Sequence, residues 1–372
     1  MNGSKILLCA IYCLLLLSVA GCDWGTGTLN LDTTDATMPP IDVRPKTTGG
    51  NLEIELQKFA ETAQSGREYT IEVIGNGHIC SQNISFPGRH NITIRLVGNE
   101  RERIIQLSDS GALFDIGSGV TLIIGENITL RGRINNTSEL ININTGAALI
   151  MRSGAKITSN TNTHNSAMAG GVIVRSGGGF LMEGGEIYKN TINNNAWGSP
   201  ARAGGVMVET GGEFEMRGGS ISGSNHGGVR VGGHFVMLNG EIRDNSGVGV
   251  HVNGGVFTME NGRIFRNTAA NGAGVNVQNA RFSMTGGEIF GNTADNSGGG
   301  VFVAANSTFT KSGGTIHGHN SGTGNTATDG IASNNRGHAV FVDTNPSRRR
   351  ESTAGAHLEL NSAIVGAAGG WE

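Results

Sequence analysis

A three-part motif recurs six times between residues 172 and 320, and it limits the possible folds of this chain more than any other feature. Each copy starts at the first valine of a Gly-Val-x-Val element, reaches a phenylalanine six to eight residues later, and reaches an isoleucine seven residues beyond that phenylalanine. The valines are Val172, Val206, Val229, Val250, Val275 and Val301, with Val340 in a variant element; the phenylalanines are Phe180, Phe214, Phe235, Phe257, Phe282 and Phe309; the isoleucines are Ile187, Ile221, Ile242, Ile264, Ile289 and Ile316. Such a repeat is typical of a solenoid, in which each copy packs against its neighbours.

Within each copy apolar residues alternate with polar ones, which is the pattern of short strands with one buried face. Gly-Gly and Asn-Gly pairs separate these strands and favour tight corners. Three strand segments in each copy therefore describe one coil of a parallel β-helix. One coil alone buries too little apolar surface to offset the conformational entropy lost on ordering, so the coils have to stack.

The spacing between copies is not constant, and the variation falls at one place in the coil. Consecutive phenylalanines are 34, 21, 22, 25 and 27 residues apart, and the gaps from each isoleucine to the next valine are 19, 8, 8, 11, 12 and 24 residues. We therefore expect every insertion to leave the same corner. Because left-handed β-helices keep a strict short period, this tolerance of insertions favours a right-handed helix.

Less regular segments extend the array. Alternating apolar residues occur at 69–107, 122–128, 149–157 and 358–364. The sequence thus predicts an all-β fold, a right-handed parallel β-helix solenoid of roughly ten coils over residues 69–372.

A short capping helix is expected over residues 51–68, before the first coil. Leu52, Leu56 and Phe59 recur there at helical spacing, so one face of the helix is apolar and suited to covering the end of the solenoid.

The first 21 residues have the form of a signal peptide. Lys5 precedes an apolar run too short to span a bilayer. Val19-Ala20-Gly21-Cys22 places small residues before a cysteine and resembles the lipobox of bacterial lipoproteins, although an ordinary secretory signal with a chance cysteine is the alternative. The resemblance implies cleavage before Cys22, acylation of Cys22 and a stable membrane anchor. Residues 22–50, rich in Thr, Asp, Gly and Pro, are expected as a lipidated flexible tether.

From about residue 50 onward the chain resembles the glycine-rich right-handed parallel β-helix lipoproteins of bacterial surfaces. Its Gly-Gly-Val elements also resemble repeats of polymorphic autotransporter passengers, and we expect the lipid at Cys22 to replace the membrane barrel of those proteins as the anchor. The resemblance implies an outer-membrane lipoprotein of the bacterial cell envelope, exposed at the surface. Pectate lyases share the fold and bind calcium through clustered acidic residues, but Asp244, Asp295 and Asp329 are scattered, so we expect no metal and no cofactor.

Composition excludes some partners. With 27 Lys and Arg against 30 Asp and Glu, the net charge is −3, which does not favour a nucleic-acid partner. The tryptophans and tyrosines that could stack on sugars are few after residue 21, namely Trp24, Tyr69, Tyr188, Trp197 and Trp371. This scarcity favours a binding module over a carbohydrate-active enzyme.

The position before each isoleucine forms a column along the predicted rod. Its members are Glu186, Ser220, Glu241, Arg263, Glu288 and Thr315. Glu241 and Glu288 are expected two rungs apart, about 9.6 Å, which is near the separation of the two carboxylates in inverting glycosidases. Because Arg263 lies between them and keeps both ionised, we interpret the column as an alternating charge ladder and not as a catalytic pair.

Further candidate residues lie in the loops and near the C-terminus. Trp197 and Arg202 lie in the 19-residue gap, where Trp197 either stacks on a ligand or, as we favour, packs within its own loop. His317 and His319 place two imidazoles near each other and His338 can approach them, but two histidines without a carboxylate or cysteine are weak evidence for a metal.

A basic triplet and a single cysteine complete the candidates. Arg348, Arg349 and Arg350 could contact an anionic surface polymer, although such a triplet is usually solvated. Cys80 is the one cysteine left after Cys22, and we expect it to be buried and inert.

Two further patterns concern the corners. The middle residue of Gly-Val-x-Val is apolar after most long gaps (Ile173, Met207, Phe302, Phe341) and polar after short ones (Arg230, His251, Asn276), so we expect long loops to cover these strands and short loops to leave them in water. The asparagines that follow the isoleucines by three or four positions are predicted to stack in a corner ladder: Asn190, Asn225, Asn245, Asn267, Asn292 and Asn320.

These features predict a monomeric, non-catalytic, lipid-anchored surface or envelope protein. It would present one loop-bearing edge to a surface glycan or to another protein. The alternative is a polysaccharide lyase or glycoside hydrolase on a pectate-lyase-like scaffold.

Overall fold

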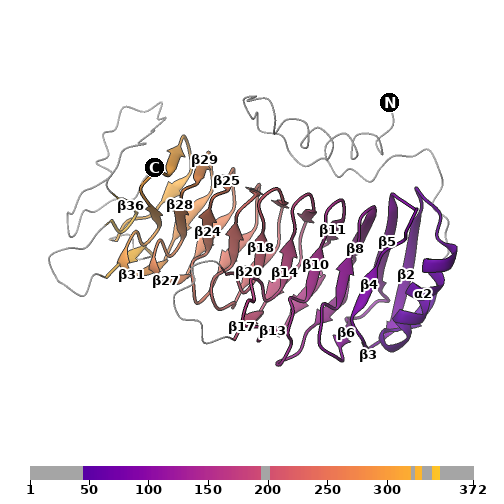
Figure 1. The fold of residues 1–372 in the computed structure, drawn as a ribbon. Helices are drawn as coiled ribbons and strands as arrows, with labels where there is room; N and C mark the ends of the chain where they lie inside the picture. The colour runs from indigo at the N-terminus through magenta and orange to yellow at the C-terminus, as the bar shows by residue number, and fades with distance from the viewer. Residues whose placement is uncertain (1–44, 194–201, 320–322, 329–336, 344–372) are drawn as a thin grey trace.

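The computed structural model describes residues 45–193, 202–319, 323–328 and 337–343, which form an elongated stack of parallel coils (Figure 1). Three long parallel sheets of 11, 10 and 10 strands run along the stack. The predicted parallel β-helix and the estimate of roughly ten coils are confirmed.

Each coil contributes one strand to each sheet, in the chain order A, B, C. Sheet A contains, in spatial order, β1 (Lys46–Thr48), β2 (Glu68–Gly75), β5 (Ile92–Gly98), β8 (Val120–Ile124), β11 (Ala148–Met151), β15 (Gly179–Met182), β19 (Glu213–Met216), β22 (His234–Met237), β25 (Val256–Met259), β29 (Arg281–Met284) and β33 (Thr308–Lys311). Sheet B contains β3 (Gly77–Ile79), β6 (Arg103–Leu107), β9 (Ile128–Arg131), β12 (Lys156–Thr158), β16 (Glu186–Tyr188), β20 (Ser220–Ser222), β23 (Glu241–Arg243), β26 (Arg263–Phe265), β30 (Glu288–Phe290) and β34 (Thr315–Ile316). Sheet C contains β4 (Gln82–Ile84), β7 (Phe114–Ile116), β10 (Ile141–Ile143), β14 (Val172–Val174), β18 (Val206–Val208), β21 (Val229–Val231), β24 (Val250–Asn253), β28 (Val275–Gln278), β32 (Val301–Val303) and β36 (Val340–Val342).

The N-terminal end of the rod is covered by a short helical segment. A 3-10 turn, η1 (Gly49–Asn51), leads into helix α2 (Leu52–Thr62), which lies within the range expected from the sequence and covers the first coil (Figure 1). Leu52 and Phe59 are buried, and the ring centroid of Phe59 lies 4.8 Å from that of Tyr69 on β2. Strand β1 lies inside the segment expected as a tether and pairs in parallel with β2.

Identical side chains stack inside the rod. The six repeat phenylalanines form one column in sheet A, with consecutive ring centroids 4.7, 4.6, 4.9, 4.8 and 4.9 Å apart. The repeat valines and isoleucines are paired in register in sheets C and B, for example Val229 with Val250 and Ile242 with Ile264. The prediction that matching offsets pile up in the core is confirmed.

A methionine column lies beside the phenylalanines, and the sequence analysis missed it. Its members stand two residues after the phenylalanine position, are fully buried and are paired in register: Met151, Met182, Met216, Met237, Met259 and Met284. The column explains why a glycine stands at each following corner. Gly262 has φ of +95°, and a Cβ there would lie 2.6 Å from Cε of Met237 on the preceding coil. Both the backbone conformation and the methionine therefore require glycine.

Candidate functional site

The corner between sheets B and C carries the insertions, as expected, and part of them forms two further parallel sheets (Figure 1). One contains β13 (Thr161–Asn162) and β17 (Thr191–Ile192), and the other contains β27 (Thr268–Asn271), β31 (Thr293–Ser297) and β35 (Thr326–Ala327). The insertions thus pair with one another across coils. We call this edge of the rod the loop-bearing corner.

A buried asparagine ladder lies beneath the loop-bearing corner. The side-chain nitrogen of Asn267 donates to Oδ1 of Asn292 at 3.0 Å and to the carbonyl oxygen of Ile242 at 3.1 Å. Asn245 donates in the same way to Oδ1 of Asn267, at 2.9 Å. Because every member is both donor and acceptor inside the protein, the ladder satisfies the polar groups of the turn and fixes its path.

Two of the asparagines predicted for the ladder need comment: the prediction was wrong for Asn225, and Asn320 is not among the described residues. Asn225 stands four residues after its isoleucine, so Ser224 occupies the ladder position and its backbone N–H donates to Asn245. Asn225 instead exchanges two hydrogen bonds with the backbone of Ile192 in β17. Asn320 lies outside the described residues, and Asn325 accepts the bond from Asn292 at 2.9 Å.

The prediction that long loops bury the outward side chains of sheet C, and that short loops leave them exposed, holds only in part. Ile173 and Met207, which follow gaps of 15 and 19 residues, are buried as expected, with exposed fractions of 1% and 3%. The expectation for the short gaps was wrong for His251 and Asn276, which are both 6% exposed.

Backbone packing explains the burial of Asn276. Its side-chain nitrogen donates to the carbonyl oxygen of Asn271 at 3.1 Å, and a Cβ at Gly272 would lie 2.8 Å from the Cβ of Asn276. A gap of only 11 residues therefore brings backbone over the strand. Phe302 and Phe341 stack on each other with centroids 5.6 Å apart and are half-buried.

Several predicted site residues fall outside the described part of the chain: Cys22, Trp197, Arg348, Arg349 and Arg350. Arg202 is described and is buried, with one guanidinium nitrogen 3.5 Å from the carbonyl oxygen of Asn165. Burial, with the Arg202 charge nearby, lowers the pKa of His226. Arg202 thus packs at the base of the corner, where it offers little surface to a partner.

The three C-terminal histidines separate into two contacts. His317 meets the ring of Phe290 edge-on, with centroids 5.7 Å apart. His319 stacks on His338 at 4.4 Å, and Nδ1 of His338 accepts a hydrogen bond from the backbone N–H of Ala327 at 3.0 Å. Burial, with His319 beside it, lowers the pKa of His338. Within the described ranges no group of three or more His, Cys, Asp or Glu side chains could hold a metal ion.

Cys80 is exposed, so the expectation of a buried cysteine was wrong. Ile79 points into the core, and the alternation of the strand turns the next side chain outward. The hydroxyl of Ser108 donates to its sulfur at 3.5 Å.

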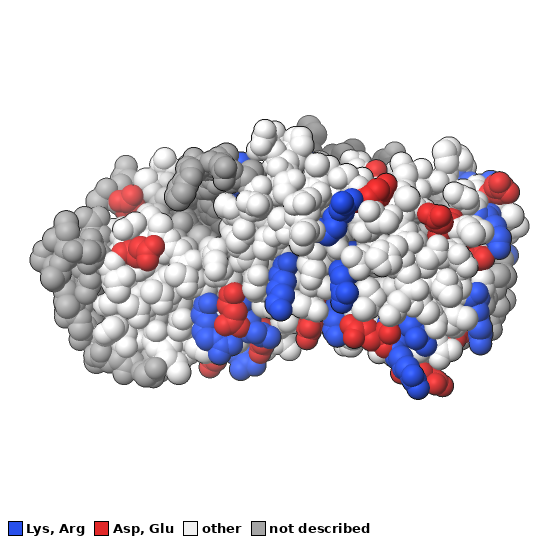
Figure 2. All heavy atoms as spheres, turned by 90° about the horizontal axis from the view of Figure 1, so that it is seen from below, with Lys and Arg blue, Asp and Glu red and all other residues white. Residues whose placement is uncertain are grey.

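The charged column on sheet B has the predicted register, with Ser220, Glu241, Arg263 and Glu288 on consecutive rungs. Arg263 pairs with Glu241, whereas no ion pair joins it to Glu288 in the part of the chain that the structure describes. Glu241 also pairs with Arg243 at 3.0 Å. Acidic and basic side chains lie next to one another in mixed patches over this side of the molecule, with uncharged surface between them (Figure 2).

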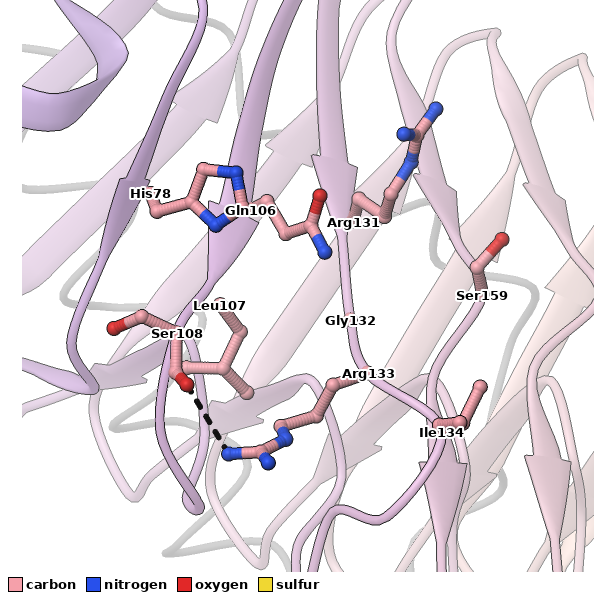
Figure 3. A pocket seen from close by; sticks show the side chains of 9 residues that line it. All are labelled: His78, Gln106, Leu107, Ser108, Arg131, Gly132, Arg133, Ile134 and Ser159. Atoms are coloured by element: carbon pink, nitrogen blue, oxygen red, sulfur yellow. Dashed lines mark hydrogen bonds between the residues drawn. The ribbon is translucent and has the colours of Figure 1, made fainter.

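A groove of about 430 Å³ lies on sheet B beside the loop-bearing corner (Figure 3). His78, Gln106 and Arg131 stand on consecutive rungs of β3, β6 and β9. The groove is completed by Leu107, Ser108, Gly132, Arg133, Ile134 and Ser159. Sequence reasoning missed it, because none of its side chains belongs to the repeat.

A second unpredicted cluster lies on the outer face of sheet A. Glu213 and Glu215 project to the same side of β19, and His234 is paired in register with Glu213. Glu215 is fully buried and pairs with Arg217 at 2.5 Å. Burial, with the charge of Glu215 next to it, raises the pKa of Glu213. The Glu-Phe-Glu sequence was the available signal, since both acids flank a core phenylalanine.

Comparisons with known proteins do not assign the chain to a family. No protein-family model, no curated protein and no solved structure matches the chain. Among the described residues, no helix is long and apolar enough to cross a membrane.

Proposed function

We propose that this chain is a non-catalytic, lipid-anchored surface or envelope protein of a bacterium, in which a β-helix rod presents its loop-bearing corner for adhesion or partner binding. The observation that carries the proposal is the pairing of the insertions across coils. Thr268, Thr293 and Thr326 are in register along β27, β31 and β35, so sequences that interrupt the repeat still form a continuous ordered edge. Pairing satisfies the backbone groups of the insertions and keeps this edge ordered, which supports its use as a binding surface.

The anchor is proposed at Cys22, ahead of the end that α2 covers. A flexible segment of about 20 residues between Cys22 and β1 would span roughly 25 Å. Acylation of Cys22 by two or three chains would hold the rod by its N-terminal end. The ten coils would then extend away from the attachment point.

Lipidation is tested by labelling cells with radioactive palmitate. We expect label in the wild-type chain and in Cys80→Ser, and none in Cys22→Ser, which should also leave the membrane fraction. Equal labelling of Cys22→Ser and the wild type would overturn the anchor. Protease shaving of intact cells then tests surface display, since a surface rod is digested while a periplasmic protein survives.

Partner binding is tested on a glycan array and on intact cells. Thr268 and Asp295 are exposed at the loop-bearing corner, and Asn306 is exposed at the corner between sheets C and A. We expect Thr268→Lys and Asp295→Lys to weaken binding and the matched control Asn306→Lys to leave it unchanged. Equal binding by all three variants would contradict the role of the loop-bearing corner.

A polysaccharide-active enzyme is the second candidate, and the carboxyls on β19 are the observation that favours it. A strand rise of about 3.3 Å per residue places the α-carbons of Glu213 and Glu215 about 6.6 Å apart. One carboxyl has a raised pKa and the other pairs with Arg217, a division that suits an acid and a base.

A reducing-end assay on acidic and neutral polysaccharides separates the two functions. Release of sugar ends that Glu213→Gln abolishes and Glu288→Gln leaves intact would establish the enzyme. We expect no release from any of the three proteins.

A further inference from the structure

In the coil before Asn160 the asparagine ladder is continued by buried Asn136, whose side-chain nitrogen donates to Oδ1 of Asn160 at 3.0 Å. Counting along the register, the position that matches Asn160 is occupied by Arg133, Ser108 and Cys80 in the three coils before it. Gly132 precedes Arg133, and a Cβ there would lie 2.4 Å from the Cβ of Asn160. Beside the buried Asn136–Asn160 pair, the side chains of Arg133 and Ser108 line the open groove of Figure 3.

The groove gathers hydrogen-bond donors that have few partners in the protein. One nitrogen of Arg133 donates to the carbonyl oxygen of Ser108 at 3.2 Å. The backbones of Arg131, Gln106 and His78 pair within sheet B. Their side chains make no hydrogen bond or ion pair with any residue that the structure describes. None of the nine lining residues is acidic. The guanidinium of Arg133 thus borders a space whose described lining residues carry no carboxylate.

Several arginines elsewhere on the rod have acidic partners on adjacent rungs. Examples are Arg95 with Glu68, Arg152 with Glu183, and Arg263 with Glu241. On the two rungs before Arg131 the matching positions hold Gln106 and His78, and on the two rungs before Arg133 they hold Ser108 and Cys80. None of these side chains carries a carboxylate.

One acid close to the groove, Glu102, is already engaged. Glu102 interacts electrostatically with Arg131, but its carboxylate accepts hydrogen bonds from Thr129 at 2.5 Å and from Lys156 at 3.0 Å. It therefore does not close the groove.

We propose that the groove binds a phosphate monoester carried on a molecule with an apolar face. Donors reach the space from the corner (Arg133) and from the strand face (Gln106 and His78), and a rotated Arg131 would add one from the next rung. Donors from several directions suit a tetrahedral anion better than a planar carboxylate. In Figure 3 the guanidinium of Arg131 points away from Arg133, and rotation about its side-chain torsions brings it over the groove. Ile134, 76% exposed, provides the apolar contact.

The probe for this site is phenyl phosphate, titrated by calorimetry into the full chain carrying Cys22→Ser. We expect Arg133→Gln and Arg131→Gln each to weaken binding about tenfold, the loss of one charge-assisted hydrogen bond. Ile134→Ser should reduce the advantage of phenyl phosphate over inorganic phosphate. The matched control Arg266→Gln removes an exposed arginine from the other half of the rod and should change nothing.

Three results would overturn the site: no binding of phenyl phosphate, equal binding of benzoate, or equal weakening by Arg266→Gln. Thermal unfolding of each variant shows whether it is folded, and the exposed Ile134→Ser tests the groove without touching the core. The inference rests on the proposed function in one respect: the phosphate is taken to belong to a binding partner of the rod. Because calorimetry uses purified protein, its outcome is independent of palmitate labelling and protease shaving.

Discussion

The four coils that begin at β2, β5, β8 and β11 follow the same path as the six that begin at β15 to β33, but they fill it differently. The column that holds phenylalanine in the later coils holds Tyr69, Ile94, Leu122 and Leu149 in the earlier ones. Flat rings stack face to face at a spacing close to the distance between strands, about 4.8 Å, so a ring favours an identical neighbour. Aliphatic side chains pack with one another in many combinations. The same coil therefore gives a visible sequence repeat only where its columns are made of side chains that match.

Core truncation should have the largest effect and should differ between the two regions. We expect Phe235→Ala to lower the free energy of unfolding by about 4 kcal/mol and Leu122→Ala by about 3 kcal/mol, since both side chains are buried and the ring leaves the larger cavity. Chemical denaturation measures both. A larger loss for Leu122→Ala would contradict the role of ring stacking.

The corner ladder offers the next contrast. Asn267→Ala leaves buried backbone groups and Asn245 without partners, so we expect a loss of about 3 kcal/mol. Arg133→Ala changes the equivalent position of an early coil, where the side chain is half-exposed, and should cost less than about 1 kcal/mol. Similar losses in the two variants would show that the ladder does not stabilise the later coils.

Corner glycines sharpen the comparison further. Gly262 and Gly154 stand at the same position in a late and an early coil, with φ of +95° and +79°. A Cβ at Gly262 would meet Met237 at 2.6 Å, whereas at Gly154 the nearest atom is 3.6 Å away. We expect Gly262→Ala to cost about 2.5 kcal/mol, from strain and overpacking, and Gly154→Ala about 1 kcal/mol, from strain alone. Thermal unfolding tests the order of the two.

The smallest effect is electrostatic and should be shared by both regions. The hydroxyl of Thr129, with Lys156, holds the pKa of Glu102 below its ordinary value of 4.5, and Arg266, with Arg243, holds that of Asp244 below 3.8. A carboxyl whose folded pKa is depressed stabilises the protein above the ordinary pKa and loses that contribution as pH falls through the folded value. We expect less than about 1 kcal/mol from each exposed pair, lost below about pH 4. Glu102→Gln and Asp244→Asn should each flatten the acid limb of a stability curve against pH.

The contrast also explains what the sequence could predict. Phenylalanine, valine and isoleucine recur at fixed offsets because their columns are uniform, and from them followed the coil, the three sheets and the corner that carries insertions. The methionine column was missed although it is equally regular, and its glycine partners were interpreted only as turn residues.

Other features depend on neighbours in space that no offset reveals. Asn225 was assigned to the ladder by type, yet its position four residues after Ile221 places it in the next strand pairing. Asn276 is buried by backbone that returns over a short gap, and Cys80 is exposed because Ile79 takes the inward position. The groove consists of side chains from four irregular coils, so only the assembled corner brings them together.

The β-helix coil depends most on the internal column of rings, and a crystal structure of the chain tests that column directly. We expect electron density for Phe180, Phe214, Phe235, Phe257, Phe282 and Phe309 as one continuous stack, with neighbouring centroids between 4.6 and 4.9 Å. Rings dispersed among separate clusters, or turned toward solvent, would contradict the coil, the loop-bearing corner and the functions proposed for it.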